Sequence, residues 1–467
     1  MAVKPVVFVP GFPASELRQR STGRLVFPPA LSDLLDPARK RELLRLLVGP
    51  DDPPGDVVAG EPIRDILGIA KQAQSLYDLL RDFGYTPLDD DLFRPVGWDW
   101  RKAVDDPTVQ DDLARAIDEL ATRSGARVVA LVHSTGGLVF RRLLETRPEL
   151  AARIEQVLAF GVPWAGNLAA VENVARGVAI RFLVTFLSAE EVQEVMSHAQ
   201  AAYDLFPPDP ARTDLHDPFG KPLNLFITAA GATVGPLVDT AWIPAGRDDM
   251  RERARSANAR LGARANPIAL PGGVPFPPIT NVAGWGVPVG TRCVLAADGG
   301  LQFSETDQGD GTVALASSSW LRGPSVRTFY LPIGVYPVSG IPFPHARIWD
   351  SPPVRQILAQ VLKGEAPAPY VCGAADGDEA IDPQSDVVTL RLVAQDGEGR
   401  PLPNAKATFH RVAEGTTAAF GAAGRAEVRL KRRNLAPNVG ADLLRFVVQV
   451  TWDGGGKGRE VPMLIRV

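Results

Sequence analysis

Ser134 is the residue of this sequence best placed to act as a nucleophile. It lies in VVALVHSTGGLV, residues 128–139, between an apolar run and a stretch with helical spacing. A serine at a sharp strand-to-helix turn exposes its hydroxyl, and that turn needs small neighbours, usually as G-x-S-x-G. Gly136 is the downstream glycine, whereas Val132 stands at the upstream position and would crowd the turn. Serine is also a favoured helix N-cap, so this segment alone leaves a nucleophile and a capping residue as alternatives.

Two later residues could complete a catalytic triad with Ser134. Asp310 lies in the glycine-rich turn QGDGTV, and His345 lies in the proline-bounded loop GIPFPHARIW. The order serine, acid, histidine is that of α/β-hydrolases. In such a triad His345 would accept the Ser134 proton and Asp310 would orient the imidazole. Each residue alone also fits a plain role, since aspartate is common in turns and a loop histidine is usually solvated.

An oxyanion hole would need two backbone N–H groups near Ser134. The residue after the nucleophile, Thr135, would supply one of them. The other should come from a turn that follows an early strand. In VPGFPAS, Pro10-Gly11 ends the first apolar run and leaves the amide of Phe12 available.

The elements that must position these residues are strands alternating with helices. Helical spacing predicts helices over 75–83, 109–124, 136–149 and 352–363. Short apolar runs predict buried strands over 6–9, 128–132, 156–160, 223–228, 279–283 and 326–331. Near-continuous apolar strands of this kind predict a doubly wound, mostly parallel α/β sheet that is covered on both faces.

Three regions are predicted along the chain. Residues 1–373 form the α/β domain, with an insertion over 161–278 that mixes short amphipathic helices and proline-rich loops, as expected of a cap. Residues 374–386 form an acidic linker. Residues 387–467 contain alternating strand-like runs separated by turn signals, which predicts a β-sandwich. This last region has 13 Lys and Arg against 7 Asp and Glu, with Lys431, Arg432 and Arg433 consecutive.

Composition excludes several function classes. The 467 residues have a formal net charge of -4, which gives no reason to expect nucleic acid binding. The five histidines are scattered and the two cysteines, Cys293 and Cys372, form no metal-ligand motif, so neither a metal nor a cofactor is predicted. Whether the two cysteines pair is open. No signal peptide or membrane-spanning segment is evident, which predicts a cytoplasmic protein.

Several motifs together resemble one family. FVPGF, GWDWRK, LVHSTGGLV, FGVPWAGN, GDGTV and the His345 loop occur in the order seen in the lecithin:cholesterol acyltransferase-like family of α/β-hydrolases. The resemblance covers about residues 5–363. It implies that Ser134, Asp310 and His345 form the triad, and that Phe12 and Thr135 donate to the oxyanion.

The same resemblance implies further residues near the site. Asp99, Trp100 and Arg101, with Trp164, would lie beside an acyl pocket; the alternative is a core tryptophan with a structural salt bridge. The family acts on acyl esters, mainly lipids, by hydrolysis or transfer. Val132 departs from the family pattern, and so does the absence of a secretion signal. The C-terminal region more weakly resembles immunoglobulin- or transthyretin-like β-sandwiches.

The sequence therefore predicts a serine hydrolase or acyltransferase for acyl esters, with a lipid-like ester as the leading substrate class. Two alternatives remain open: a catalytically silent binding or scaffold protein on the same fold, and an esterase or thioesterase for a non-lipid substrate. The basic C-terminal region could contact an anionic membrane or a protein partner. It could equally be a solvated surface or a partner for the acidic part of the same chain.

Overall fold

The structure is a computed structural model of the whole chain. It describes residues 4–48, 56–66, 70–71, 73–85, 92–177, 187–207, 226–228, 243, 246–261, 268–285, 287–296, 300–306, 309–333, 345–363, 387–394, 402, 404–410, 416–422, 424–431, 443–453 and 459–466. The second cysteine, Cys372, the acidic linker at 374–386 and the pair Arg432-Arg433 lie outside these residues.

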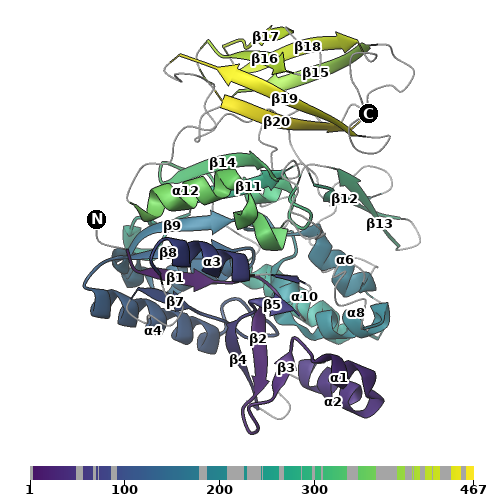
Figure 1. Cartoon of the computed structure of the whole chain (residues 1–467). Helices are drawn as coiled ribbons and strands as arrows, with labels where there is room; N and C mark the ends of the chain where they lie inside the picture. The colour runs from purple at the N-terminus through teal and green to yellow at the C-terminus, as the bar shows by residue number, and fades with distance from the viewer. Residues whose placement is uncertain are drawn as a thin grey trace.

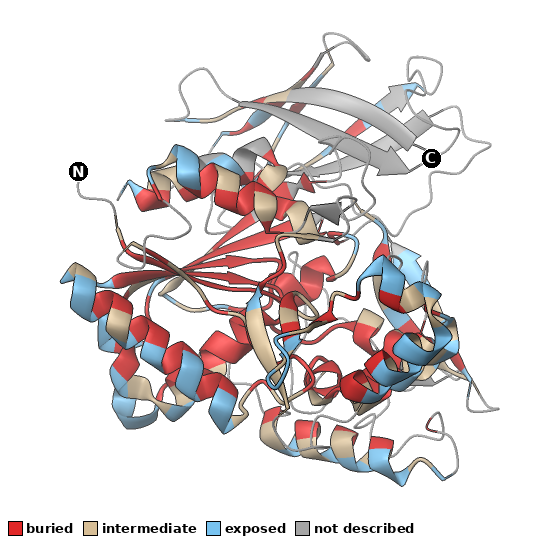
Figure 2. Cartoon of the chain, turned by 60° about the horizontal axis from the view of Figure 1, so that its bottom comes forward, coloured by how far each residue is buried: buried red, intermediate tan, exposed pale blue. Residues whose placement is uncertain are grey.

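A six-stranded parallel sheet lies at the centre of the molecule. Its order is β14-β11-β9-β8-β1-β7, and every neighbouring pair is parallel. The strands are, in chain order, β1 (Val6–Val9), β7 (Phe93–Pro95), β8 (Val128–His133), β9 (Ile154–Phe160), β11 (Ile279–Trp285) and β14 (Val326–Pro332). The predicted α/β class is confirmed. Figure 2 shows this sheet as an almost uniformly buried layer.

Side chains of the inner strands alternate between two apolar layers, because successive residues of a strand point to opposite faces. Val6 and Phe8 pack with α3 (Gln74–Asp82), the 3₁₀ helix η5 (His345–Asp350) and α12 (Pro352–Leu362). Val7 and Val9 pack with α4 (Pro107–Ser124) and α5 (Gly136–Thr146) on the other face. Both faces are therefore covered, as predicted.

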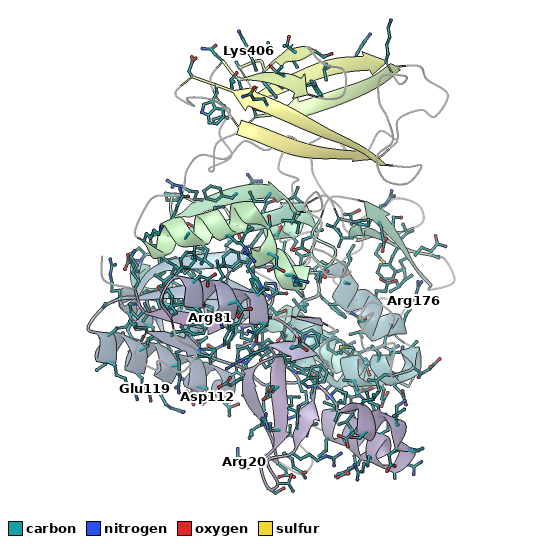
Figure 3. The ribbon with its side chains drawn as sticks, in the orientation of Figure 1. Arg20, Arg81, Asp112, Glu119, Arg176 and Lys406 are labelled. Atoms are coloured by element: carbon teal, nitrogen blue, oxygen red, sulfur yellow. The ribbon has the colours of Figure 1, made fainter. Side chains whose placement is uncertain are left out.

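The helix boundaries follow local capping signals. Asp106 caps α4 by accepting from the Thr108 N–H, Pro107 occupies its first turn, and Gly125 ends it in the left-handed region at φ 64°. Asp112 projects from the outer side of α4 (Figure 3). The helix predicted over 136–149 is shorter, because α5 ends at Thr146 and a 3₁₀ helix, η1 (Pro148–Arg153), begins at the proline.

An excursion between β1 and α3 extends from the lower part of the molecule in Figure 1. It contains an antiparallel sheet of β2 (Ser15–Gln19), β3 (Leu25–Phe27) and β4 (Val57–Pro62). It also contains α1 (Leu31–Leu35), α2 (Pro37–Val48) and the short pair β5 (Asp65–Ile66) and β6 (Ala70–Lys71). The sequence did not predict these elements.

The region predicted as a cap contains helices that share the core of the sheet. They are α6 (Leu168–Arg176), α8 (Ala189–His198), α9 (Gln200–Asp204), α10 (Asp248–Leu261) and the 3₁₀ helix η3 (Pro271–Gly273). Val171, Val192, Met196 and Ala201 are fully buried in the same apolar cluster as Val7 and Val9. The described cap helices therefore have no separate core.

The strand predicted over 223–228 does not join the central sheet. The structure has a three-residue strand, β10 (Phe226–Thr228), parallel to β12 (Val289–Leu295), which pairs with β13 (Leu301–Thr306) in a separate three-stranded sheet. A short apolar run predicts extended backbone, but it carries no information on which sheet the strand joins. A further short helix, α11 (Leu315–Ser318), follows Asp310.

The C-terminal strands are all antiparallel (Figure 1). One sheet pairs β15 (Val387–Val393) with β18 (Arg425–Lys431), and the other has the order β17-β16-β19-β20. These four are β16 (Lys406–His410), β17 (Thr417–Ala419), β19 (Leu443–Thr451) and β20 (Arg459–Arg466). The predicted all-β region agrees with these sheets.

Across the described residues, no helix has the length and apolar character that crossing a membrane needs.

Candidate active site

Ser134 occupies a strained turn between β8 and α5. Its φ is 52°, in the left-handed region that non-glycine residues rarely adopt. Its N–H donates to the Phe160 carbonyl of the neighbouring strand at 3.0 Å, and its carbonyl accepts from the Gly137 N–H at 3.0 Å. A serine in this conformation costs on the order of 1–3 kcal/mol. An N-cap serine has extended backbone, whereas this left-handed turn is the conformation expected of a nucleophile between a strand and a helix.

The turn fits because three neighbours lack a side chain. A Cβ on Gly136 would stand 2.4 Å from the Val9 carbonyl oxygen, and one on Gly137 would stand 2.5 Å from the Val162 methyl carbons. Gly11, on the facing turn, likewise has no room for a Cβ beside Ser134. Val132, expected to crowd the elbow, is fully buried within β8, in register with Val9 and Ala159.

Asp310 and His345 form a buried pair. His345 Nδ1 lies 2.6 Å from Asp310 Oδ2, and Asp310 is fully buried. The other oxygen, Oδ1, accepts from the backbone N–H groups of Thr312 at 3.1 Å and Val313 at 2.7 Å. These two amides fix the carboxylate, so Oδ2 is left to receive the Nδ1–H of the imidazole.

The remaining ring nitrogen of this histidine has no partner. His345 Nε2 is buried and makes no hydrogen bond to any described residue. A buried ring nitrogen without a partner is uncommon and calls for an explanation. With Nδ1 bearing the proton toward Asp310, Nε2 has a free lone pair and can accept a proton.

Neighbouring contacts bring this pair to the elbow. A Cβ on Gly161, whose φ is 54°, would stand 2.7 Å from Asp310 Oδ2 and 3.0 Å from His345 Nδ1. Gly161 directly follows Phe160, the residue that accepts from Ser134 N–H. The ring of His133, directly before Ser134, lies 4.7 Å from the His345 ring. Ser134, Asp310 and His345 thus meet at the carboxyl ends of β8 and β9, although no hydrogen bond joins Ser134 Oγ to another described residue.

The two predicted oxyanion donors flank Ser134. Phe12 follows Gly11, whose missing side chain faces the serine, and Thr135 begins the turn into α5. Within the described part of the chain neither backbone N–H donates a hydrogen bond, so both remain available. The Thr135 hydroxyl is buried and also has no partner among these residues.

Asp99 and Arg101 form a buried structural pair. Arg101 Nη2 lies 2.6 Å and Nε 2.9 Å from the Asp99 carboxylate, while Nη1 donates to the Leu46 carbonyl at 2.7 Å. Arg101 therefore ties the loop after β7 to the end of α2. These guanidinium donors are used by Asp99 and by a backbone carbonyl, which favours the structural alternative for this pair.

Trp100 and Trp164 differ in their surroundings. The Trp164 indole N–H donates to Asn281 Oδ1 at 3.1 Å, so this side chain packs within the sheet core. The Trp100 N–H donates to the Ser15 carbonyl at 3.2 Å, and its ring lies edge-on to Phe12 at 5.5 Å. Trp100 therefore contacts Phe12, one of the two predicted oxyanion donors.

Trp100 also lines a small apolar cavity, with room of about 10 Å³ for a water-sized sphere. The cavity lies between the excursion and helix α8. Its walls come from β3, α2 and α8, together with the segment that precedes α8: Phe27, Pro29, Leu47, Trp100, Leu187, Val192, Val195 and Met196. No polar side chain lines it, and a hydrocarbon chain would enter it only if these walls moved apart.

The comparisons with known proteins include one match to a family model. Residues 66–238 match the family model described as lecithin:cholesterol acyltransferase. The resemblance predicted from the sequence motifs is thereby confirmed, and the α/β-hydrolase fold expected from it agrees with the parallel sheet. The match to the lecithin:cholesterol acyltransferase family includes Ser134, Thr135 and the Asp99–Arg101 segment. Phe12, Asp310 and His345 lie outside the matched residues.

Solved structures that resemble this chain have low sequence identity to it. The crystal structure of the Tle4–Tli4 complex is 14% identical, with a TM-score of 0.49, and the match covers 78% of this chain and 98% of that one. Bacillus licheniformis lipase BlEst2 in its mature form is 12% identical, with a TM-score of 0.30 and coverages of 77% and 92%. Phospholipase PlaB from Legionella pneumophila is 12% identical, with a TM-score of 0.29 and coverages of 99% and 91%. No curated protein sequence matches the chain.

The sequence analysis did not single out His133 and Gly161 as site residues, and it named Gly11 only as the turn residue that ends the first strand. The two glycines matter only through backbone contacts with segments far away in sequence. His133 had one signal, its position directly before the serine. Within the described residues, no cluster of three or more metal-ligating side chains occurs.

Proposed function

We propose that this protein is a serine hydrolase or acyltransferase that cleaves lipid-like acyl esters. The observation that carries the proposal is the buried Asp310–His345 pair beside the Ser134 elbow, with His345 Nε2 left without a partner. A base that is oriented on one side and free on the other is what proton abstraction from a serine requires.

The chemistry would proceed in two balanced halves. Ser134 Oγ attacks the ester carbonyl carbon while its proton passes to His345 Nε2. The amides of Phe12 and Thr135 would stabilise the oxyanion of the tetrahedral intermediate. As the intermediate collapses, the C–O bond to the leaving alcohol breaks and the alcohol takes the proton from His345. The acyl group is then bound to Ser134.

The second half removes the acyl group. Water or a second alcohol loses a proton to His345 Nε2 and attacks the acyl carbon. The bond to Ser134 Oγ breaks, and the serine recovers the proton. Hydrolysis and transfer use the same residues and differ only in the nucleophile of this step.

Two observations support a lipid-like substrate. The match to the lecithin:cholesterol acyltransferase family supports an enzyme of lipid esters. The cavity beside Trp100 has only apolar walls and is linked to the elbow through the contact of Trp100 with Phe12. A hydrocarbon chain gains about 0.8 kcal/mol for each CH₂ group that it buries.

A fluorophosphonate probe tests the proposal, because such a probe phosphonylates an activated serine. Wild-type protein should be labelled at one site, and Ser134→Ala should not. A panel of p-nitrophenyl esters then tests the substrate class, with kcat/KM expected to rise with chain length. Wild-type protein that resists the probe would instead support a silent binding protein. Labelling with a preference for short esters would support a non-lipid esterase.

A further inference from the structure

His133 is a buried histidine that the proposed chemistry does not use. It is the last residue of β8, directly before Ser134. Its imidazole lies between two rings of η5, 4.7 Å from the His345 ring and 4.8 Å from the Trp349 ring. Its Nε2 lies 3.0 Å from the backbone carbonyl oxygen of His345.

This hydrogen bond determines the protonation of His133. A carbonyl oxygen can only accept, so Nε2 must carry the hydrogen and donate it. Burial holds the pKa of His133 well below 6.5, and the positive charge that His345 carries when protonated lowers it further. The ring is therefore a neutral donor at physiological pH.

The position of His345 depends on two independent anchors. Asp310 holds the side chain through Nδ1, and His133 holds the main chain through the carbonyl. An imidazole that is fixed only at its ring can still shift with its backbone, and displacement of a catalytic group by about 1 Å can cost on the order of 100-fold in rate. A main-chain anchor next to the nucleophile removes that freedom.

Trp349 completes the support. Its ring packs edge-on against His133, and its Nε1–H donates to Ser75 Oγ of α3 at 2.9 Å. His133 thus packs against Trp349, which is itself hydrogen-bonded to helix α3.

We propose that His133 is a positioning residue, whose Nε2–H holds the backbone of His345 so that His345 Nε2 is directed at Ser134. The inference rests on the proposed function, because it assigns His133 to the same reaction. It goes beyond the triad by predicting that one nitrogen of a residue outside the triad controls the rate.

Three substitutions separate the hydrogen bond from the bulk of the ring. Glutamine places its amide nitrogen where histidine has Nε2, asparagine places it where histidine has Nδ1, and phenylalanine keeps the ring without a donor. We expect His133→Phe and His133→Asn to lower kcat by about 10–100-fold, with KM nearly unchanged. We expect His133→Gln to stay within about 3-fold of wild type.

Fluorophosphonate labelling provides the second measurement. The rate of Ser134 labelling should follow kcat through the series, since both depend on the same base. Thermal melting reports folding, and the Gln–Asn comparison remains decisive should the Phe variant not fold. Equal rates for Gln and Asn, or a wild-type rate for a folded Phe variant, would overturn the inference. Failure of the proposed function has a different signature, namely no labelling of the wild-type protein.

Discussion

A Cβ added to Gly11 would stand 2.6 Å from the Cβ of Ser134 and 3.1 Å from its Oγ. The turn after β1 and the turn after β8 therefore touch. The first carries a proposed oxyanion donor, and the second carries the proposed nucleophile. Separation of the two turns would alter both groups together.

Gly11→Ala should therefore lower activity more than stability. The added methyl must push Ser134 or the Phe12 amide out of place, so we expect kcat/KM to fall at least about 10-fold. Overpacking should cost about 1–3 kcal/mol in the free energy of unfolding. Gly290→Ala is the matched control, because its nearest contact is Leu168 Cβ at 3.8 Å. Equal activity of the two variants would contradict the tight contact.

Asp310→Asn should preserve the fold and lower kcat by about 10³–10⁴-fold. The asparagine oxygen can still accept from Thr312 and Val313, which leaves its NH₂ group facing His345. Two donors then oppose each other, and the imidazole must move its proton to Nε2, where it can no longer act as a base. Kinetics with a p-nitrophenyl ester and thermal melting check this expectation. A drop in melting temperature that accounts for the lost activity would argue for a structural role instead.

Arg260→Gln should weaken the packing of α10 against α9 and the loop before α4. Arg260 on α10 lies 2.5 Å from the fully buried Asp204 carboxylate and also pairs with Asp105 in the loop before α4. Burial raises the pKa of Asp204, and Arg260 opposes that rise. Without the arginine, we expect a loss of about 2–3 kcal/mol, from hydrogen bonds to charged groups. Urea unfolding measures the loss.

Arg115→Gln is the control for this prediction. Arg115 pairs with Asp112 on the exposed side of α4, where both side chains are at least 60% exposed. A pair in water contributes less than about 1 kcal/mol. Equal losses for Arg260→Gln and Arg115→Gln would mean that the Arg260 pair contributes no more than a surface pair.

His133 should make stability depend on pH. Its pKa lies well below 6.5 in the folded protein, because of burial and the nearby His345, itself paired with Asp310. Below about pH 6.5 the unfolded chain binds a proton that the folded chain does not. The free energy of unfolding is therefore unaffected by the titration of His133 above that pH. Below it, this free energy falls by up to about 1.4 kcal/mol per pH unit. His133→Gln lacks this term, so its melting temperature should fall less from pH 7 to pH 5; parallel curves would contradict the assignment.

Met196→Trp should shorten the preferred acyl chain. Met196 on α8 lines the small apolar cavity beside Trp100, and a larger ring there would block an acyl chain that enters by moving these walls apart. We expect kcat/KM for long p-nitrophenyl esters to fall by about 10-fold or more, at about 0.8 kcal/mol for each CH₂ that is excluded, with short esters nearly unaffected. A uniform loss across all chain lengths would place the acyl group elsewhere.

The central sheet could be predicted because its signal is local. Buried strands such as Val128–His133 are apolar throughout, and the nearby helices carry their own spacing and caps. The residues that meet at the elbow could be named for the same reason, since each lies in a short motif after a strand. These residues can be expected to lie close together because the carboxyl ends of parallel strands share one edge of the sheet.

Other features depend on contacts that no local pattern contains. The His133 hydrogen bond joins residues 212 positions apart. The role of Arg101 could not be decided, because its partners include the Leu46 carbonyl, which any residue could present. The antiparallel sheet of the excursion was missed because its strands are short and only partly buried.

The shared core of sheet and cap limits how a substrate can reach Ser134. The described cap helices bury Val171, Val192, Met196 and Ala201 completely within the cluster that also holds the strand residues. Swinging these helices away as one body would expose several such side chains, at about 1.5–3 kcal/mol each, so the open population would be negligible. The described helices share the core of the sheet, so under the proposed function a substrate would enter through smaller local rearrangements. For a bulky lipid, the rate of those rearrangements would then limit turnover, and the chemical step would be faster.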